Sequence, residues 1–206
     1  MTDAYLQPYL DAQRTHGTDF DVTLWARPET QRRRFDVFCQ MLYLDGKRVL
    51  DAGCSRGDFA AFMLERGVAY GSFVGVDGVP EVIEFANGRR LTASKFLAGD
   101  FVKDVSLLGT DAPQIVTISG TLNTMDADTA IRVLEGAWAG CSEALLFNFL
   151  SDRAGENAPP QEYPAKRLPT LKLLDWALSR TPSVQLRQDY FPHGHDATIL
   201  MRREEV

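Results

Sequence analysis

The stretch VLDAGCSRGDF, residues 49–59, joins a predicted apolar strand to a glycine-containing turn and the start of a helix. It includes Gly53-Cys54-Ser55-Arg56-Gly57, a literal G-x-S-x-G, which in an α/β-hydrolase exposes a nucleophilic serine on a tight turn. The same turn can instead bring the backbone close to a nucleotide-like cofactor, because glycine has no Cβ and the N-terminus of a helix carries unpaired N–H groups. The rest of the chain has to decide between these two interpretations.

Short apolar segments alternate with helical ones after residue 47, with Gly67 and Gly88 expected at helix C-termini. Apolar strands that alternate with helices indicate a parallel sheet covered on both faces. We expect strands at Arg48–Ala52, Ser72–Asp77, Ser94–Ala98, Ile115–Ser119 and Ala144–Leu150, and helices at Asp58–Glu65, Pro80–Asn87 and Asp126–Ala139, with a short helix at Val102–Leu108.

The C-terminal part has a different pattern, in which a helix at Pro169–Ser179 precedes two strands, one starting near Ser183 and one at Ala197–Met201. The connection between these strands is too short for a parallel crossover, so they are expected to pair antiparallel. The sequence therefore predicts an α/β fold with a doubly wound, mixed seven-stranded sheet, mostly parallel with the last strand antiparallel. We expect one domain, with a helical N-terminal extension over residues 1–46 and a core over residues 47–206.

Composition excludes several classes of protein. The net charge of −6 gives no broad basic surface for nucleic acid, and the run Arg32-Arg33-Arg34 is expected on a solvated helix face. The three cysteines and three histidines show no CxxC motif and no metal-ligand spacing, so we expect free thiols and no metal site. The N-terminus lacks a signal-peptide pattern, and no stretch approaches the ~20 apolar residues of a membrane span. These features predict a cytoplasmic protein without membrane or nucleic-acid partners.

Two carboxylates decide the opening question. Asp51 ends the first strand, and Asp77 ends the second, 20 positions after Gly57. A carboxylate at that place accepts hydrogen bonds from the hydroxyls of a bound ribose. The hydrolase interpretation has a nucleophile in Ser55 and histidines far downstream, but it gives neither aspartate a role. The cofactor interpretation uses both, and we therefore favour it.

The turn also resembles motif I of the class I S-adenosylmethionine-dependent methyltransferases, with Ser55 in place of the usual middle glycine. Further segments resemble later family motifs: GVDGVPEVIEFA (75–86), LAGDF (97–101) and IVTISGTLN (115–123). The resemblance implies S-adenosylmethionine as cofactor and S-adenosylhomocysteine as product. It places Asp77 on the ribose, Asp100 on the adenine amino group and Phe101 beside the ring. The cofactor contacts that it implies are Asp51, Gly53, Cys54, Ser55, Gly57, Asp77, Gly78, Asp100, Phe101, Ser119 and Gly120.

The methyl acceptor is expected to be a small molecule methylated on oxygen or nitrogen. In an open α/β sheet it binds beyond the carboxyl ends of the strands, where the long polar loop Ser151–Arg167 could close over it. Asn123, Trp25, Tyr163 and Arg34 are the candidate substrate contacts. His195 and Tyr190 are the candidates for catalysis. An imidazole titrates near neutrality, so a histidine here could accept a proton from the substrate. The alternative is that the histidines simply occupy an exposed hairpin turn.

Two other functions stay open. The chain could bind S-adenosylmethionine without catalysis. The serine at position 55 in place of the family's glycine, and the absence of a clear general base, agree with this alternative. It could also be a hydrolase that uses Ser55. Retained cofactor binding without turnover of any methyl acceptor favours the first, and covalent labelling of Ser55 by a fluorophosphonate favours the second.

Overall fold

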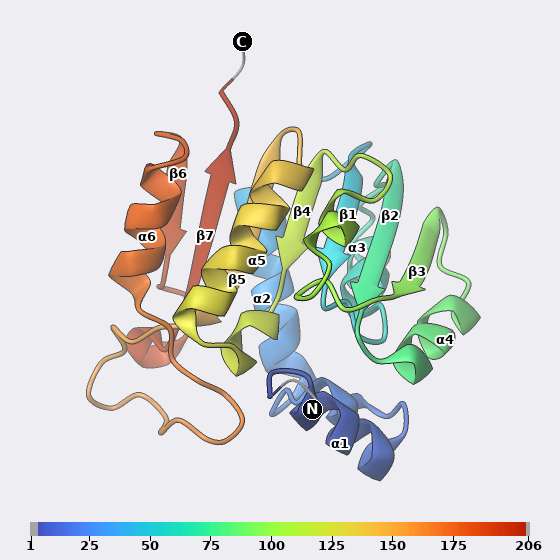
Figure 1. Ribbon diagram of the computed structural model, residues 1–206, viewed down its shortest axis with the longest axis horizontal. Helices are drawn as coiled ribbons and strands as arrows, with labels where there is room; N and C mark the ends of the chain where they lie inside the picture. The colour runs from blue at the N-terminus through green and yellow to red at the C-terminus, as the bar shows by residue number, and fades with distance from the viewer. Residues whose placement is uncertain (1–3, 205–206) are drawn as a thin grey trace.

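A seven-stranded sheet forms the centre of the structure, a computed structural model that describes residues 4–204 (Figure 1). The strand order is β3-β2-β1-β4-β5-β7-β6. β7 runs antiparallel to its neighbours β5 and β6 and the other strands run parallel, which confirms the predicted mixed doubly wound sheet. The strands are β1 (Arg48–Ala52), β2 (Ser72–Asp77), β3 (Ser94–Ala98), β4 (Ile115–Ile118), β5 (Ala144–Leu150), β6 (Val184–Arg187) and β7 (Asp196–Arg202).

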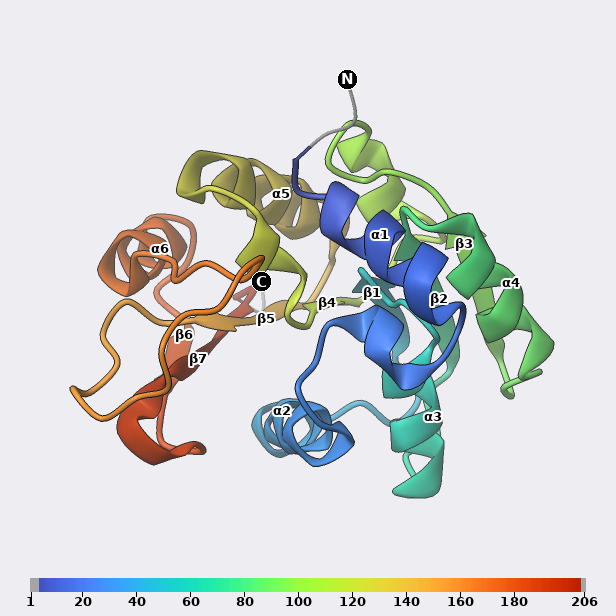
Figure 2. The same ribbon diagram turned by 90° about the horizontal axis from the view of Figure 1, so that it is seen from below.

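Helices cover both faces of this sheet (Figure 2). One face carries α2 (Pro28–Met41), α3 (Asp58–Glu65) and α4 (Pro80–Gly88), and the other carries α5 (Ala127–Gly140) and α6 (Thr170–Leu178). Successive side chains of a strand point to opposite faces, so Val49 packs with α2, α3 and α4 whereas Leu50 packs with α5 and α6. Two apolar cores result, one on each face of the sheet. The carboxyl ends of the parallel strands, which carry polar residues, lie together at one edge of the sheet.

Some element boundaries differ from the sequence prediction. α4 continues through Gly88, and the left-handed backbone that ends this segment falls on Arg90. The short helix expected at Val102–Leu108 is a 3₁₀ helix, η2, at Val105–Gly109. The amides of Val102 and Lys103 donate to Asp100 Oδ1, so a turn occupies the start of the expected helix.

The N-terminal segment lies across the carboxyl ends of the parallel strands, with α1 (Gln7–His16) over β1 and β2 in Figure 2. It continues into the 3₁₀ helix η1 (Phe20–Thr23), whose Val22 packs with Val79 and Val82. A Cβ on Gly78 would lie 2.9 Å from the Leu6 side chain, so the segment contacts the tip of β2 closely. α2, in contrast, belongs to the core, where Phe35 and Phe59 have ring centroids 5.0 Å apart.

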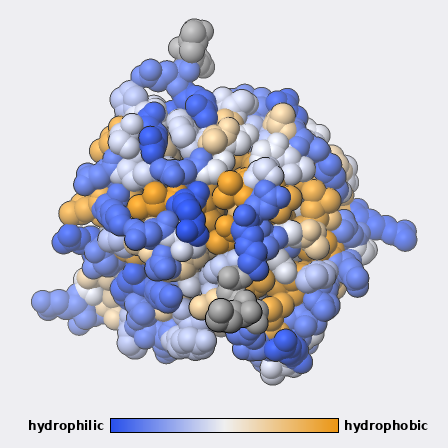
Figure 3. Space-filling view, viewed as in Figure 1, coloured by the Kyte–Doolittle hydropathy of each residue, from blue (hydrophilic) through white to orange (hydrophobic). Residues whose placement is uncertain are grey.

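The face seen in Figure 3 is largely hydrophilic, with separate hydrophobic patches. Exposed apolar side chains of the described residues include Leu171 and Leu178 on α6 and Val105 on η2. No helix within residues 4–204 combines the length and the apolar character that crossing a bilayer requires.

Candidate cofactor and acceptor site

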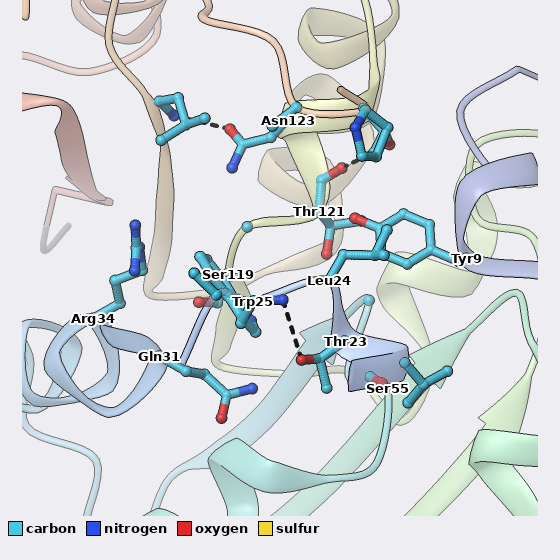
Figure 4. Close-up of a pocket in the computed structure, with 18 of the residues that line it drawn as sticks. Tyr9, Thr23, Leu24, Trp25, Gln31, Arg34, Ser55, Ser119, Thr121 and Asn123 are labelled. Atoms are coloured by element: carbon cyan, nitrogen blue, oxygen red, sulfur yellow. Dashed lines mark hydrogen bonds between the residues drawn. The ribbon is translucent and has the colours of Figure 1, made fainter. Parts of the chain in front are cut away.

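A cavity of about 960 Å³ lies at the carboxyl edge of the sheet. Its walls come from the turn after β1, the tips of β2 and β3, the turn after β4, the N-terminal segment and two C-terminal segments (Figure 4). All residues proposed from the sequence line it except Gly57 and Tyr190. Its volume lies within the range of small-molecule and cofactor pockets.

The turn after β1 is built by backbone geometry that favours glycine. Gly53 has φ +78° and Ser55 has φ +46°, both in the left-handed region. The Gly53 amide donates to the Val76 carbonyl at 2.8 Å, which ties the turn to β2. A Cβ on Gly53 would overlap the side chain of Thr121, so the turns after β1 and β4 approach each other at this point.

Gly53→Ala is expected to lower the free energy of unfolding by about 2–4 kcal/mol, because left-handed strain of about 1–2 kcal/mol adds to overpacking against Thr121. Gly46→Ala is the matched control: Gly46 has φ +70° but nothing within 4 Å of the added Cβ, so only the strain applies. Urea denaturation of both variants measures the difference. Equal losses would show that the contact between the two turns is unimportant.

Gly57 serves the fold rather than the cavity. It is the N-cap residue of α3 at φ +71°, and a Cβ there would come within 2.7 Å of the Phe96 ring. Asp58, the first residue of α3, makes no side-chain cap and pairs with Arg89. The sequence assignment of Gly57 to the cofactor is therefore not supported by its position.

Asp51 and Asp77 reach the cavity from neighbouring strands. The Asp51 carboxylate accepts a hydrogen bond from Thr117 Oγ1 at 2.7 Å, and burial raises its pKa from an ordinary value of 3.8 to about 7. Asp77 accepts hydrogen bonds from the Ser55 and Val79 amides at 2.9 and 3.0 Å. Burial also raises the pKa of Asp77, while these amides lower it. Each Asp77 oxygen keeps a lone pair for a ligand hydroxyl.

Asp100 follows β3 and meets the N-terminal segment. Tyr5 donates its hydroxyl to the Asp100 carboxylate, with distances of 3.0 and 2.8 Å to the two oxygens. The neighbouring Phe101 is buried in the core and also lines the cavity. Asp51, Asp77 and Asp100 therefore open on one cavity, as the sequence predicts, with Tyr5 as an additional partner of the third.

The turn after β4 continues the cavity wall. The Gly120 amide donates to Asn148 Oδ1 at 2.7 Å, and Asn148 Nδ2 donates to Ser119 Oγ at 3.2 Å. A Cβ on Gly120 would overlap the ring of Trp25, so Trp25 packs directly on this turn. Trp25 thus lines the cavity from the segment before α2.

Arg34 is buried and does not lie on the solvated helix face that the sequence predicts. It is 5 % exposed, and its Nε donates to Asp196 Oδ1 at 2.9 Å while a second nitrogen pairs with Oδ2. Its guanidinium also stacks on the rings of Trp25 and Phe191, at 4.3 and 4.5 Å from their centroids. The charge of Arg34 is therefore neutralised by protein, although the residue lines the cavity.

The loop between β5 and α6 forms the outer wall. Its residues 159–165 line the cavity, and Tyr163 is 90 % exposed there. Arg167 fixes the base of the loop by donating to the carbonyls of Ser151 and Pro159, at 2.9 and 2.8 Å. The Lys166 amide donates to the Asn123 carbonyl at 2.7 Å, which attaches the loop to the turn after β4.

His195 lines the cavity at the start of β7, but Tyr190 does not. His195 Nδ1 lies 3.1 Å from the Pro192 carbonyl oxygen, and Nε2 lies 3.8 Å from Asp196 Oδ2. The Tyr190 hydroxyl is buried against Thr198 Oγ1 at 2.8 Å, and burial raises the pKa of Tyr190. The structure thus leaves His195 as a candidate for proton transfer and gives Tyr190 a packing role.

Sequence reasoning missed several lining residues from the N-terminal segment, including Tyr5, Tyr9 and Gln31. Gln31 is 6 % exposed, and its side chain has no hydrogen bond within residues 4–204. A signal was available, because Gln31 shares a helix face with Phe35 and Phe38, where a polar residue is unexpected. Nothing comparable marked the two tyrosines, which lie far in sequence from the strand tips.

No protein-family model matches the sequence, and no curated protein matches it. Solved structures do match. Magnesium protoporphyrin IX methyltransferase from Synechocystis PCC 6803 with bound SAM has a TM-score of 0.70 at 13 % identity, covering 99 % of this chain and 99 % of that one. Phosphoethanolamine N-methyltransferase 1 from Haemonchus contortus, in complex with phosphoethanolamine and S-adenosylhomocysteine, has a TM-score of 0.71 at 13 % identity, covering 97 % and 48 %.

The small RNA methyltransferase HEN1 matches at a TM-score of 0.70 and 15 % identity, covering 88 % of this chain and 26 % of that one. These proteins act on different acceptors according to their names, so the structural similarity does not identify the class of methyl acceptor. At such low sequence identity, the similarity shows only a shared arrangement of helices and strands. The chain has the Rossmann-like fold of the class I S-adenosylmethionine-dependent methyltransferases.

Proposed function

We propose that this protein is an S-adenosylmethionine-dependent methyltransferase that methylates a small molecule. The observation that carries the proposal is the convergence of the Gly53–Gly57 turn with Asp51, Asp77 and Asp100 at one cavity on the carboxyl edge of the sheet. In open α/β sheets, that edge binds nucleotide-like ligands. When bound, S-adenosylmethionine supplies a methyl group on a sulfonium centre, and a neutral thioether leaves.

The residues present fit this cofactor. The free lone pairs of Asp77 suit the two ribose hydroxyls. Asp100 Oδ1 accepts from the Val102 and Lys103 amides, so Oδ2, which also accepts from Tyr5, is the oxygen that suits the adenine amino group. Phe101 offers an apolar side chain for the adenine ring, and Ser55 offers a small side chain where the family pattern has glycine. The turn at Ser119 and Gly120 would then border the methyl group, with Gly78 at the tip of β2 near the nucleoside.

A small molecule is the proposed methyl acceptor because the remaining part of the cavity is enclosed by three segments. Trp25, the loop residues 159–165 and Phe191 surround it, and the net charge of −6 provides no broad basic surface for a nucleic acid. His195 is the proposed proton acceptor. If Nδ1 donates to Pro192, Nε2 is left without a proton and can receive one from the substrate.

The two alternatives have less support. A binding module without catalysis would need no proton acceptor, yet His195 lines the cavity. A hydrolase needs a histidine bonded to Ser55, and no such hydrogen bond exists within the described residues. The Ser55 amide instead binds Asp77, which gives the turn a role in positioning that carboxylate.

Calorimetry with S-adenosylhomocysteine tests the proposed function. We expect a dissociation constant of ~10⁻⁶ to 10⁻⁴ M for the unaltered protein and at least tenfold weaker binding for Asp77→Ala, because the variant loses the ribose contacts. Asp175→Ala, an exposed position on α6 outside the cavity, is the control and should bind unchanged. No detectable heat for the unaltered protein, or equal affinity in Asp77→Ala, would contradict the proposal.

A further inference from the structure

The side chain of Asn123 presents a fixed hydrogen-bond donor to the cavity. Asn123 is 7 % exposed, and its Oδ1 accepts a hydrogen bond from the Leu150 amide at 2.8 Å. Since that amide can only donate, the orientation of the Asn123 side chain is determined, and Nδ2 is left on the other side. Figure 4 shows Nδ2 directed toward the space bordered by Ser119 and Trp25. Within residues 4–204, Nδ2 has no hydrogen-bond acceptor.

We call the part of the cavity lined by Leu24, Trp25, Asn123, Leu150, residues 159–165, Phe191 and His195 the methyl-acceptor side. The buried charged groups on this side already have partners within the protein. Of the buried carboxylates, Asp196 is bound to Arg34, and Asp51 lies near the end of β1 on the cofactor side of the cavity. Arg167 is half-buried, and two nitrogens of its guanidinium donate to the carbonyls of Ser151 and Pro159. A protonated amine would find no unpaired buried carboxylate here, and a phosphate would find no unpaired buried cation.

Most of the remaining walls of this side are apolar, and the polar exceptions Gln161 and Glu162 are exposed to solvent. The apolar walls comprise the rings of Trp25 and Phe191, the side chains of Leu24 and Leu150, and Pro159 and Pro160. Such walls suit an aromatic or otherwise planar molecule. Asn123 Nδ2 adds one requirement, because a buried donor needs an oxygen or similar hydrogen-bond acceptor on the ligand. The features together select an uncharged planar molecule with an oxygen at one position.

We propose that the methyl acceptor is a phenolic or enolic hydroxyl compound, whose reacting oxygen accepts a hydrogen bond from Asn123 Nδ2. The inference rests on the proposed function and narrows its acceptor from oxygen or nitrogen to oxygen. An imidazole base is better matched to a phenol, with a pKa near 10, than to an alkyl alcohol. In the transfer the hydroxyl proton passes to His195 Nε2 and the oxygen bonds to the methyl carbon, while the carbon–sulfur bond breaks and leaves its electron pair on sulfur.

The test compares two probes on the protein saturated with S-adenosylhomocysteine. Anisole, the methyl ether that a phenol would yield, is uncharged and its oxygen only accepts hydrogen bonds, and benzylamine at pH 8.5 is a cation of similar size. Calorimetry should show that anisole binds and that benzylammonium binds at least tenfold more weakly. Binding of benzylammonium with equal or higher affinity, or no binding of anisole, would overturn the proposal.

The variant Asn123→Asp keeps an oxygen for the Leu150 amide and replaces only the Nδ2 donor. Anisole affinity should fall at least tenfold, whereas Asn157→Asp, which adds the same charge at an exposed loop position outside the cavity, should change it less than twofold. Unchanged affinity in Asn123→Asp would refute the role of this residue. If the variant loses S-adenosylhomocysteine binding, the comparison of the two probes on the unaltered protein still decides the acceptor class. If the unaltered protein does not bind S-adenosylhomocysteine, the proposed function fails instead.

Discussion

Replacing Arg34 by methionine is expected to lower the free energy of unfolding by about 3–5 kcal/mol, because Asp196 would be left buried without a partner. Both side chains are almost completely buried, at 6 % and 1 % exposure, and they join α2 to β7. Global stability of a domain is only about 5–15 kcal/mol, so the loss would be visible as a large shift of the urea midpoint. The contacts of Arg34 with Trp25 and Phe191 would also be lost, and the methyl-acceptor side would lose its shape.

Arg32→Met is the matched control for Arg34→Met. Arg32 lies on the same helix, pairs with Glu65 and stacks on Phe62, but both partners of the pair are about half exposed. Exposed ion pairs contribute ~1 kcal/mol or less, so this variant should be nearly as stable as the unaltered protein. The double variant Arg34→Met/Asp196→Leu should recover much of the loss, because no buried charge remains unpaired. Similar losses for Arg32→Met and Arg34→Met would contradict this account.

Asp51→Asn is expected to stabilise the protein by about 2–4 kcal/mol at pH 8, and by almost nothing below pH 4. Burial raises the pKa of Asp51 from 3.8 to about 7. Well below pH 4 the carboxyl group is protonated in both the folded and the unfolded chain. As the pH rises from 4 to 7, the unfolded chain releases this proton while the folded chain retains it, so the native protein loses stability relative to the neutral variant. A shift of this size corresponds to at most about 4 kcal/mol.

Urea titrations of the two proteins between pH 4 and 8 measure this difference. Asparagine preserves an oxygen for Thr117 Oγ1, so the packing of the two strand ends is retained. Asp126→Asn should show the opposite sign, since hydrogen bonds from Thr129 lower the pKa of Asp126, and its charged form therefore stabilises the fold above pH 4. If the free energies of unfolding of Asp51→Asn and the unaltered protein change with pH in the same way, burial does not destabilise the charged form of Asp51.

The sheet and the cofactor side could be predicted from sequence because their signals are local. Apolar strands such as Ser72–Asp77 carry their polar residue at the end, and parallel strands place those ends at one edge. Asp51, Asp77 and Asp100 therefore had to lie together once the order of the strands was known. The Gly53 turn was marked by its glycines, although its contact with Thr121 was not.

The methyl-acceptor side could not be predicted in the same way, because long-range pairing determines it. Arg34 and Asp196 are 162 positions apart, and nothing near either residue indicates that they bind each other. Tyr190 and His195 looked equivalent in the sequence, yet one side chain is buried beside Thr198 and the other lines the cavity. The donor of Asn123 becomes evident only when its oxygen is seen to be occupied by Leu150.

A crystal structure of the protein with S-adenosylhomocysteine tests the central claim most directly. We predict that the nucleoside occupies the cavity at the carboxyl edge, with both ribose hydroxyls within about 2.5–3.2 Å of the Asp77 carboxylate and the adenine amino group facing Asp100. The thioether sulfur should then face the methyl-acceptor side near Ser119 and Asn123. A nucleoside bound elsewhere, or one whose ribose makes no contact with Asp77, would contradict the account.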